Sequence, residues 1–256
     1  MLKPHSALHA LIIAALAILP FYEAVAQSPT PVLVELFTSE GCSSCPPADA
    51  FLRTLDSTQP IQGAQLIVLG EHVDYWDDQG WRDIYSDHNF TVRQDNYVNR
   101  MGLKSSYTPQ IIVDGSTECS GNDPKRAIDV IEKARVQSKV SLQISSATVA
   151  NGKLSAHIES DTLPENAEVF VALALDHAES QVLRGENGGH HLEHVAVARN
   201  FVKVGKAGKG ATFAKDVELK VKPASAYRVI AFIQEANQGK ILGVVEKPLT
   251  GEKAAP

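Results

Sequence analysis

Two cysteines spaced C-x-x-C directly after an apolar run constrain the fold of this chain most strongly. Residues 32–37 read VLVELF, and residues 41–46 read GCSSCP. A buried strand that turns into a helix at this point would set the thiols beside helix N-terminal amides, which favour a thiolate. The pattern predicts a redox dithiol in which an accessible Cys42 attacks and a buried Cys45 resolves the mixed disulfide. The alternative is a permanent disulfide that only joins the strand to the helix.

A proline at the entrance of another apolar run supports the redox interpretation. Tyr107, Thr108 and Pro109 precede a second, mostly apolar strand, which we expect at residues 110–114. An X-Pro bond in this position can be cis and can hold extended backbone against an active site. We expect a cis Thr108–Pro109 bond, with substrate backbone pairing to Thr108 as an added strand. Tyr107 and Trp76 are expected to line the same substrate groove, although aromatic residues in such loops often serve packing instead.

The amino terminus has the features of a secretory signal peptide. Residues 1–26 contain Lys3, an apolar stretch at 10–19 and the small-residue signal Ala24-Val25-Ala26. The stretch is shorter than the roughly 20 residues that span a bilayer. We therefore expect a periplasmic or secreted protein with no stable membrane insertion after cleavage. Because such compartments are oxidising, they permit disulfides and favour the dithiol interpretation.

Charge and length limit the partners and the number of domains. The net charge is −6, with no basic block, which argues against nucleic acid as a partner. Without the signal, the chain exceeds the ~100–150 residues of a typical domain. Residues 27–139 alternate strand and helix patterns in the order β-α-β-α-β-β-α, which predicts a thioredoxin-like domain. Residues 140–250 contain short alternating apolar segments with no helical pattern, which predicts a β-sandwich-like domain.

Several strings closely resemble one bacterial family of exported thioredoxin-like proteins, known as domain of unknown function 1223. They are VELFTSEGCSSCPPAD at 34–49, HVDYWD at 72–77, GW at 80–81 and YTPQ at 107–110. The string RGENGG at 184–189, followed by His194 and Arg199, resembles the second half of that family. The resemblance extends over essentially the whole mature chain. It implies a fold but no reaction.

Glu35 is the third candidate catalytic residue, because it interrupts the apolar run seven positions before Cys42. Thioredoxins carry a buried acid at nearly the same place, where it exchanges a proton with the resolving thiol. If Glu35 points beneath the helix, burial should raise its pKa and suit it to that role. The alternative is that the alternation of the strand turns Glu35 to solvent.

Other residues suggest a rival chemistry based on metal. The segment 176–193 reads as a long loop and, with the residue that follows it, carries four histidines, which are His177, His190, His191 and His194. These could ligate copper or zinc together with the cysteine thiolates or His72. Because no spacing matches a known site, we predict no metal ligands and no cofactor. The third cysteine, Cys119, is expected to be a buried, inert thiol.

The leading hypothesis is an exported thiol:disulfide oxidoreductase that acts through Cys42 and Cys45 on protein or small-thiol disulfides. It would need a redox partner, which the sequence does not identify. The alternatives are a periplasmic copper or other metal-binding protein that uses the same thiolates, and a non-catalytic binding module on a thioredoxin scaffold.

Overall fold

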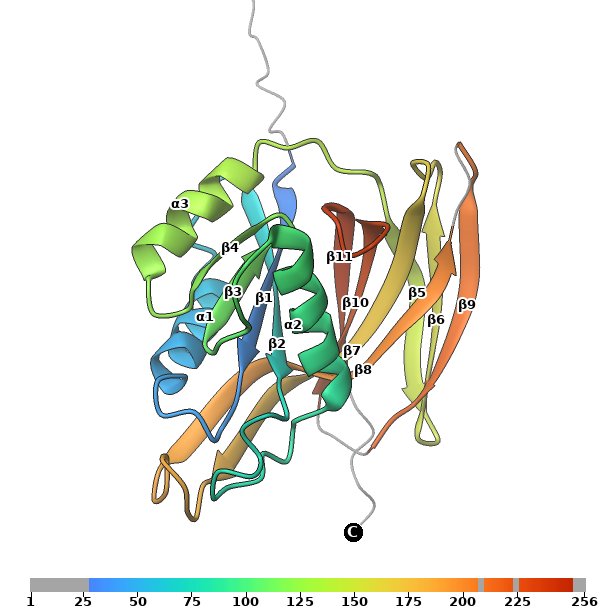
Figure 1. Ribbon diagram of the computed structural model, residues 1–256. Coiled ribbons are helices and arrows are strands. Elements are labelled where there is room, and N and C mark those ends of the chain that lie inside the picture. Colours follow the sequence, from blue (N-terminus) through green and yellow to red (C-terminus); the bar gives the residue numbers. More distant parts are fainter. Residues whose placement is uncertain (1–27, 207–209, 223–225, 251–256) are drawn as a thin grey trace, which may run out of the picture.

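The core is a mixed eight-stranded sheet in the order β11-β10-β7-β8-β2-β1-β3-β4 (Figure 1). The structure is a computed structural model that describes residues 28–206, 210–222 and 226–250. The strands of this sheet are β1 (Thr30–Thr38), β2 (Ala64–His72), β3 (Gln110–Val113), β4 (Thr117–Ser120), β7 (Ala167–Gln181), β8 (His191–Lys206), β10 (Ala226–Glu235) and β11 (Ile241–Thr250). A second sheet contains β5 (Gln143–Ala150), β6 (Lys153–Ser160) and β9 (Phe213–Lys220). The helices are α1 (Pro46–Thr58), α2 (His88–Met101) and α3 (Pro124–Ala134).

The strand β1 lies between β2, to which it is parallel, and β3, to which it is antiparallel. Its residues from Val32 onward are buried, as expected for a strand covered on both faces. On one face lies α1, whose Leu52 approaches Gly70, the cross-strand partner of Leu36. The helix predicted at the C-x-x-C therefore packs on the sheet, and it begins directly after the second cysteine.

The helix α2 covers the other face of β1. It begins where the Asp87 carboxylate accepts a hydrogen bond from the backbone of Asn89, and it ends at Gly102 with φ 65°. The ring of its Tyr97 packs edge-on against Phe37 at 6.2 Å. Because side chains alternate along a strand, Phe37 and Leu36 face opposite helices.

The sheet continues from β2 directly into the second half of the chain. Gly70 of β2 pairs with Val197 of β8, and β7, β10 and β11 follow. The predicted division into a thioredoxin-like domain and a separate sandwich is therefore not confirmed. An alternating apolar pattern identifies a strand but does not reveal which strand is its neighbour. For this reason the sequence could not show that the two halves share a sheet.

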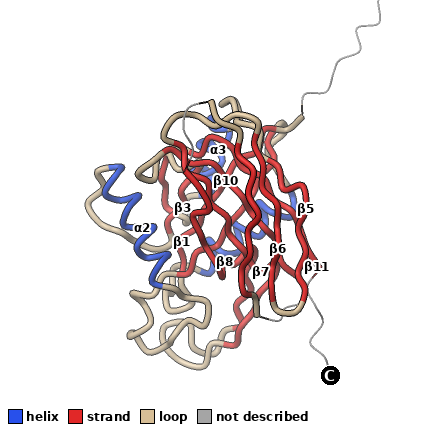
Figure 2. Tube along the Cα trace, turned by 90° about the vertical axis from the view of Figure 1, so that its right-hand side faces the viewer, coloured by secondary structure: helices blue, strands red, loops and turns tan. Residues whose placement is uncertain are grey.

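The three-stranded sheet β5-β6-β9 packs as a second layer on β7 and β10 of the large sheet. Their shared core contains Leu154 and Ile158 on one side and Val171 and Val229 on the other. Figure 2 shows α2 at one side of the molecule and β5 and β6 toward the opposite side.

The predicted signal peptide lies outside the described residues. Among those that are described, no helix has the length and apolar composition needed to cross a bilayer.

Candidate functional site

Cys42 and Cys45 form a disulfide at the turn between β1 and α1. The amide of Cys45 donates to the carbonyl of Cys42 at 3.1 Å, and Cys45 is the N-cap residue of the helix. The predicted setting of the motif is therefore present. The expected accessibility of Cys42 is wrong for this disulfide form, because Cys42 is only 1% exposed and Cys45 is fully buried. The intervening Ser43 and Ser44 are exposed.

The loop that covers the disulfide comes from the hairpin of β7 and β8, far away in the sequence. Ser43 donates its amide hydrogen to Glu186 Oε2 at 3.0 Å. The side-chain amide of Asn187 donates to the carbonyls of Glu40 and Cys42 at 2.8 and 3.0 Å. Our sequence reasoning missed both covering residues. Their only sequence signal was the RGENGG string that resembles the family.

The Thr108–Pro109 bond is cis, as predicted. Trp76 donates its indole N–H to Thr108 Oγ1 at 2.8 Å, and a Cβ added to Gly41 would lie 3.0 Å from Trp76 Cβ. Trp76 thus contacts both Gly41, the residue before Cys42, and the loop that carries Thr108 and Pro109, called the proline loop below. Of the predicted substrate-binding residues, the structure brings Trp76 and Thr108 together beside the disulfide loop.

Pro109 approaches α1 around a glycine. A Cβ placed on Gly121 would lie 2.8 Å from both the Ala48 Cβ and the Pro109 Cβ. Only a residue without a side chain fits between the first turn of the helix and the proline. The tight packing at Gly121 thereby fixes the proline loop against the helix that begins at the disulfide.

Tyr107 is held on the β4 side of the same loop. Its hydroxyl donates to Glu118 Oε2 at 2.6 Å, and its carbonyl accepts from Gln94 Nε2 at 2.7 Å. Burial and the adjacent Glu118 carboxylate raise the pKa of Tyr107. These contacts give the side chain a role in fixing the loop. A contact of Tyr107 with substrate stays a prediction.

Glu35 is buried, but it does not lie beneath α1. It faces α2, where it accepts hydrogen bonds from Arg93 Nε and the Tyr97 hydroxyl, each at 2.7 Å. Arg93 Nε also lies 3.5 Å from Glu71, and burial together with the charge of Glu35 raises the pKa of Glu71 well above its usual range. The proposed proton exchange between Glu35 and Cys45 is therefore wrong in its geometry, because the two lie on opposite faces of the sheet. Strand alternation set this face, and the sequence left it undetermined.

Another buried acid–base cluster lies on the α1 side of the sheet. His194 of β8 is 3% exposed and lies between Glu40 and Asp49, with each ring nitrogen 3.6 Å from a carboxylate oxygen. Asp49, on α1, also accepts a hydrogen bond from the Thr38 hydroxyl. A small cavity of about 240 Å³ adjoins Asp49, His194 and Pro46. Sequence reasoning missed this cluster, although all of its members lie in strings that resemble the family.

The charge of His194 follows from this environment. Burial disfavours the imidazolium, but the Asp49 and Glu40 carboxylates, each 3.6 Å from a ring nitrogen, outweigh it and raise the pKa of His194 to about 9. The ring of His194 meets the ring of His72 edge-on at 4.7 Å, and His72 Nδ1 lies 2.7 Å from Asp83. Burial disfavours the charged form of Asp83, yet the neighbouring His72 outweighs burial and lowers the pKa of Asp83.

The other histidines do not form the cluster that the rival metal-binding hypothesis requires. His177 lies on β7 and His191 begins β8, so the expected long loop is only the hairpin tip at residues 182–190. His177, His190 and His191 are exposed, whereas His194 is buried. In the described part of the chain, no three histidine, cysteine, aspartate or glutamate side chains are arranged to hold a metal ion.

Cys119 is a free thiol in the core, 5% exposed, as predicted. Burial and the charge of Glu118 raise its pKa to about 11. A buried thiol that stays protonated is a poor nucleophile. Cys119 is therefore not a candidate for thiol chemistry.

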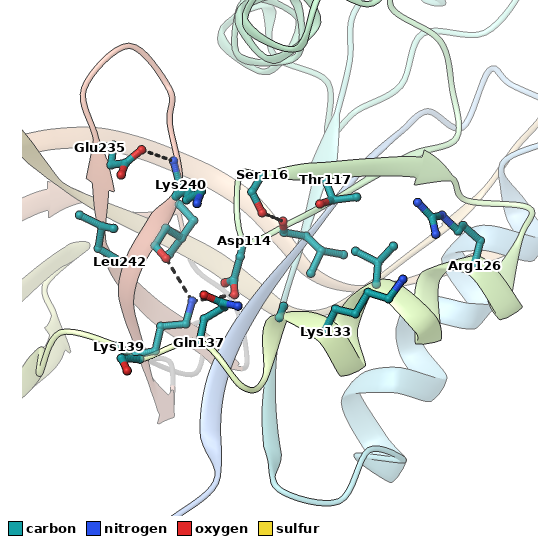
Figure 3. Close-up of a pocket in the computed structure, with 15 residues that line it drawn as sticks. Asp114, Ser116, Thr117, Arg126, Lys133, Gln137, Lys139, Glu235, Lys240 and Leu242 are labelled. Carbon is teal, nitrogen blue, oxygen red and sulfur yellow. Dashed lines mark hydrogen bonds and ion pairs between the residues drawn. The ribbon is translucent and has the colours of Figure 1, made fainter.

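A separate cavity of about 610 Å³ lies between the β3–β4 turn, α3 and the β10–β11 turn (Figure 3). Lys139 Nζ, which lines it, lies 2.6 Å from Asp114 Oδ2 and donates to the Ile241 carbonyl at 3.1 Å. No residue of the disulfide loop lines this cavity. It is therefore distinct from the candidate site.

Comparison with known proteins assigns the family. A family profile described as protein of unknown function (DUF1223) matches residues 33–234. The chain belongs to this family. The match includes both the disulfide loop and the hairpin tip that covers it.

One solved structure similar to this member of the family is the crystal structure of protein AGR_C_4864 from Agrobacterium tumefaciens. It is 25% identical, the alignment covers 90% of this chain and 99% of that chain, and the TM-score is 0.65. A second, a DUF3823 family protein from Bacteroides ovatus, is 10% identical, with coverage of 43% of this chain and 52% of that chain and a TM-score of 0.29. This second likeness carries no argument. Among curated proteins, none matches.

Proposed function

We propose that the protein is an exported thiol:disulfide oxidoreductase that works through Cys42 and Cys45 on a thioredoxin-like scaffold. The observation that carries the proposal is a C-x-x-C disulfide at a strand-to-helix turn, joined through Trp76 to a loop with a cis Thr108–Pro109 bond. Placing a redox disulfide next to a loop that can hold extended substrate backbone is the arrangement that disulfide exchange requires. The predicted signal sequence supports export to an oxidising compartment.

The reaction balances with two thiols and one disulfide. In the reduced protein, the Cys42 thiolate attacks a substrate disulfide, and a mixed disulfide forms while one substrate sulfur leaves as a thiolate and takes a proton. The Cys45 thiolate then attacks Cys42, which re-forms the disulfide and releases the second substrate thiol. Two electrons pass to the substrate. A donor dithiol of the redox partner reverses these steps on the protein and returns it to the reduced state.

The helix supports the attacking role of Cys42. The first helical turn begins at Pro46, and the positive end of the helix dipole favours negative charge on a nearby sulfur. The Cys42 sulfur also lies 3.3 Å from the Ser44 hydroxyl, which can donate a hydrogen bond to a thiolate. Both effects lower the cost of forming the thiolate on Cys42.

The decisive experiment measures catalysed reduction of insulin disulfides by dithiothreitol. The wild type should accelerate this reaction, and Cys42→Ser should abolish the acceleration. Cys45→Ser should trap mixed disulfides, because the resolving thiol is missing. Cys119→Ser is the matched control and should retain full turnover, since that thiol is buried elsewhere. Equal rates with and without the wild-type protein would contradict an oxidoreductase function.

A further inference from the structure

The tip of the β7–β8 hairpin lies over the disulfide and is tied to it by three hydrogen bonds. The Glu186 carboxylate accepts one from the Ser43 amide at 3.0 Å. The side-chain amide of Asn187 donates the other two, to the carbonyls of Glu40 and Cys42 at 2.8 and 3.0 Å. In Figure 1 this tip, in orange, lies beside the start of α1. The contacts join segments that are more than 140 residues apart in the chain.

This arrangement blocks the reaction that the disulfide would perform. In exchange, an incoming thiolate must approach one sulfur from the side opposite the leaving sulfur. With Cys42 at 1% exposure and Cys45 fully buried, neither sulfur offers such an approach. Asn187, at 2% exposure, is itself part of the cover. The cover must therefore shift before any thiol can react.

The tip is built to shift as a unit. Gly189 donates to the Val182 carbonyl at 2.8 Å, and Val182 donates to the His190 carbonyl at 3.0 Å, so the tip keeps its own hydrogen bonds when it moves. The arms below it are fixed, since the Tyr85 hydroxyl donates to the Glu179 carbonyl at 2.8 Å. Opening consequently breaks the three bonds to the disulfide loop and separates Gly185 from Trp81, against which it packs, but leaves the hairpin intact.

We propose that Asn187 and Glu186 form a gate that determines which thiols reach the Cys42–Cys45 disulfide. Small thiols react only during transient opening of the tip. A protein thiol reacts only when its own backbone displaces the tip and takes over the hydrogen bonds to the Glu40 and Cys42 carbonyls and the Ser43 amide. The physiological meaning of the gate rests on the proposed function.

Reduction by dithiothreitol tests the gate without a natural substrate. One thiolate of the reagent attacks Cys42, the S–S bond breaks, and Cys45 leaves as a thiolate that takes a proton. The second thiol of the reagent then attacks the mixed disulfide, releases Cys42 as a thiol and leaves the cyclic oxidised reagent. The rate of this reaction reports how often the sulfurs become accessible.

Asn187→Asp is the sharpest variant, because it keeps the shape of the side chain but removes both donated hydrogen bonds and sets a carboxylate against two carbonyl oxygens. We expect it to react with dithiothreitol at least about tenfold faster than the wild type, since each net hydrogen bond changes an equilibrium by roughly fivefold. Glu186→Ala should give about a fivefold increase. Leu183→Ala, on the same tip but 75% exposed, is the matched control and should react at the wild-type rate.

Labelling of the buried Cys119 by iodoacetamide distinguishes gate opening from unfolding. Faster disulfide reduction in Asn187→Asp with unchanged, slow Cys119 labelling supports the gate. Equal acceleration of both reactions, or a dithiothreitol rate equal to that of the wild type, overturns it. The same proteins are also assayed with insulin. If the wild type does not accelerate insulin reduction, but Asn187→Asp is still reduced faster than the wild type by dithiothreitol, the proposed oxidoreductase function is refuted and the gate is supported.

Discussion

Glu35 illustrates how a single side chain acquires its role from the face on which it lies. Its carboxylate is paired with the buried Arg93, so removing it leaves a buried cation whose remaining carboxylate partner is Glu71, at 3.5 Å. Glu35→Leu should lower the free energy of unfolding by about 2–4 kcal/mol, as breaking a buried pair does. Urea denaturation measures the loss. Glu35→Gln, which can still accept a hydrogen bond, should lose less, and insulin turnover per folded molecule should be unchanged in both.

His194 should make stability depend on pH in the alkaline range. Its pKa is about 9 in the folded protein against about 6.5 when unfolded, so the folded state binds the proton more tightly. His194 therefore makes its full contribution to the free energy of unfolding below pH ~6.5, and this contribution is lost as the pH rises through ~9. The loss is on the order of 3 kcal/mol, because one pKa unit corresponds to about 1.4 kcal/mol. His194→Gln should flatten this part of the stability curve, whereas the exposed His190→Gln should leave it unchanged.

At the level of the elements, the critical contact is the one between β2 and β8. A Cβ added to Gly70 would lie 3.2 Å from the Val195 carbonyl oxygen, which belongs to the backbone and cannot rotate away. Gly70→Ala should therefore push the two strands apart and cost about 1–3 kcal/mol in urea denaturation, as overpacked sites do. Wild-type stability in this variant would mean that the two strands can separate locally without loss.

The predictions that succeeded rested on signals within a few residues of one another. The strand followed by the C-x-x-C predicts the turn into α1, and Tyr107-Thr108-Pro109 before an apolar run predicts the cis bond. What failed depended on distant parts of the chain. Asn187 reaches the Cys42 carbonyl across a sequence separation of 145 residues, and no local pattern encodes that contact. The exposure of Cys42 was predicted wrongly for the same reason.

At the level of the whole molecule, the two halves should unfold together. The Arg93 guanidinium lies over the ring of Phe201 at 4.6 Å and donates to Gln234 at 3.3 Å, so a side chain of the first half has its partners in the second. A fragment of residues 28–139 would expose the edge of β2 and leave the Arg93 side chain without these partners. We expect this fragment to lack the cooperative thermal transition of the intact chain, as followed by circular dichroism. A fragment that melts cooperatively would establish an independent domain.

The positions of the two tryptophans determine what the intrinsic fluorescence of the protein reports. The chain contains only two, Trp76 and Trp81, and both lie in the segment between β2 and α2. One donates to Thr108 at 2.8 Å and the other to Glu40 at 2.8 Å, so both are tied to the surroundings of the disulfide. The tryptophan fluorescence of this protein therefore originates beside the loop that carries the Cys42–Cys45 disulfide. Its emission reports the state of this one site rather than the average of the fold, and no dye is needed to follow it.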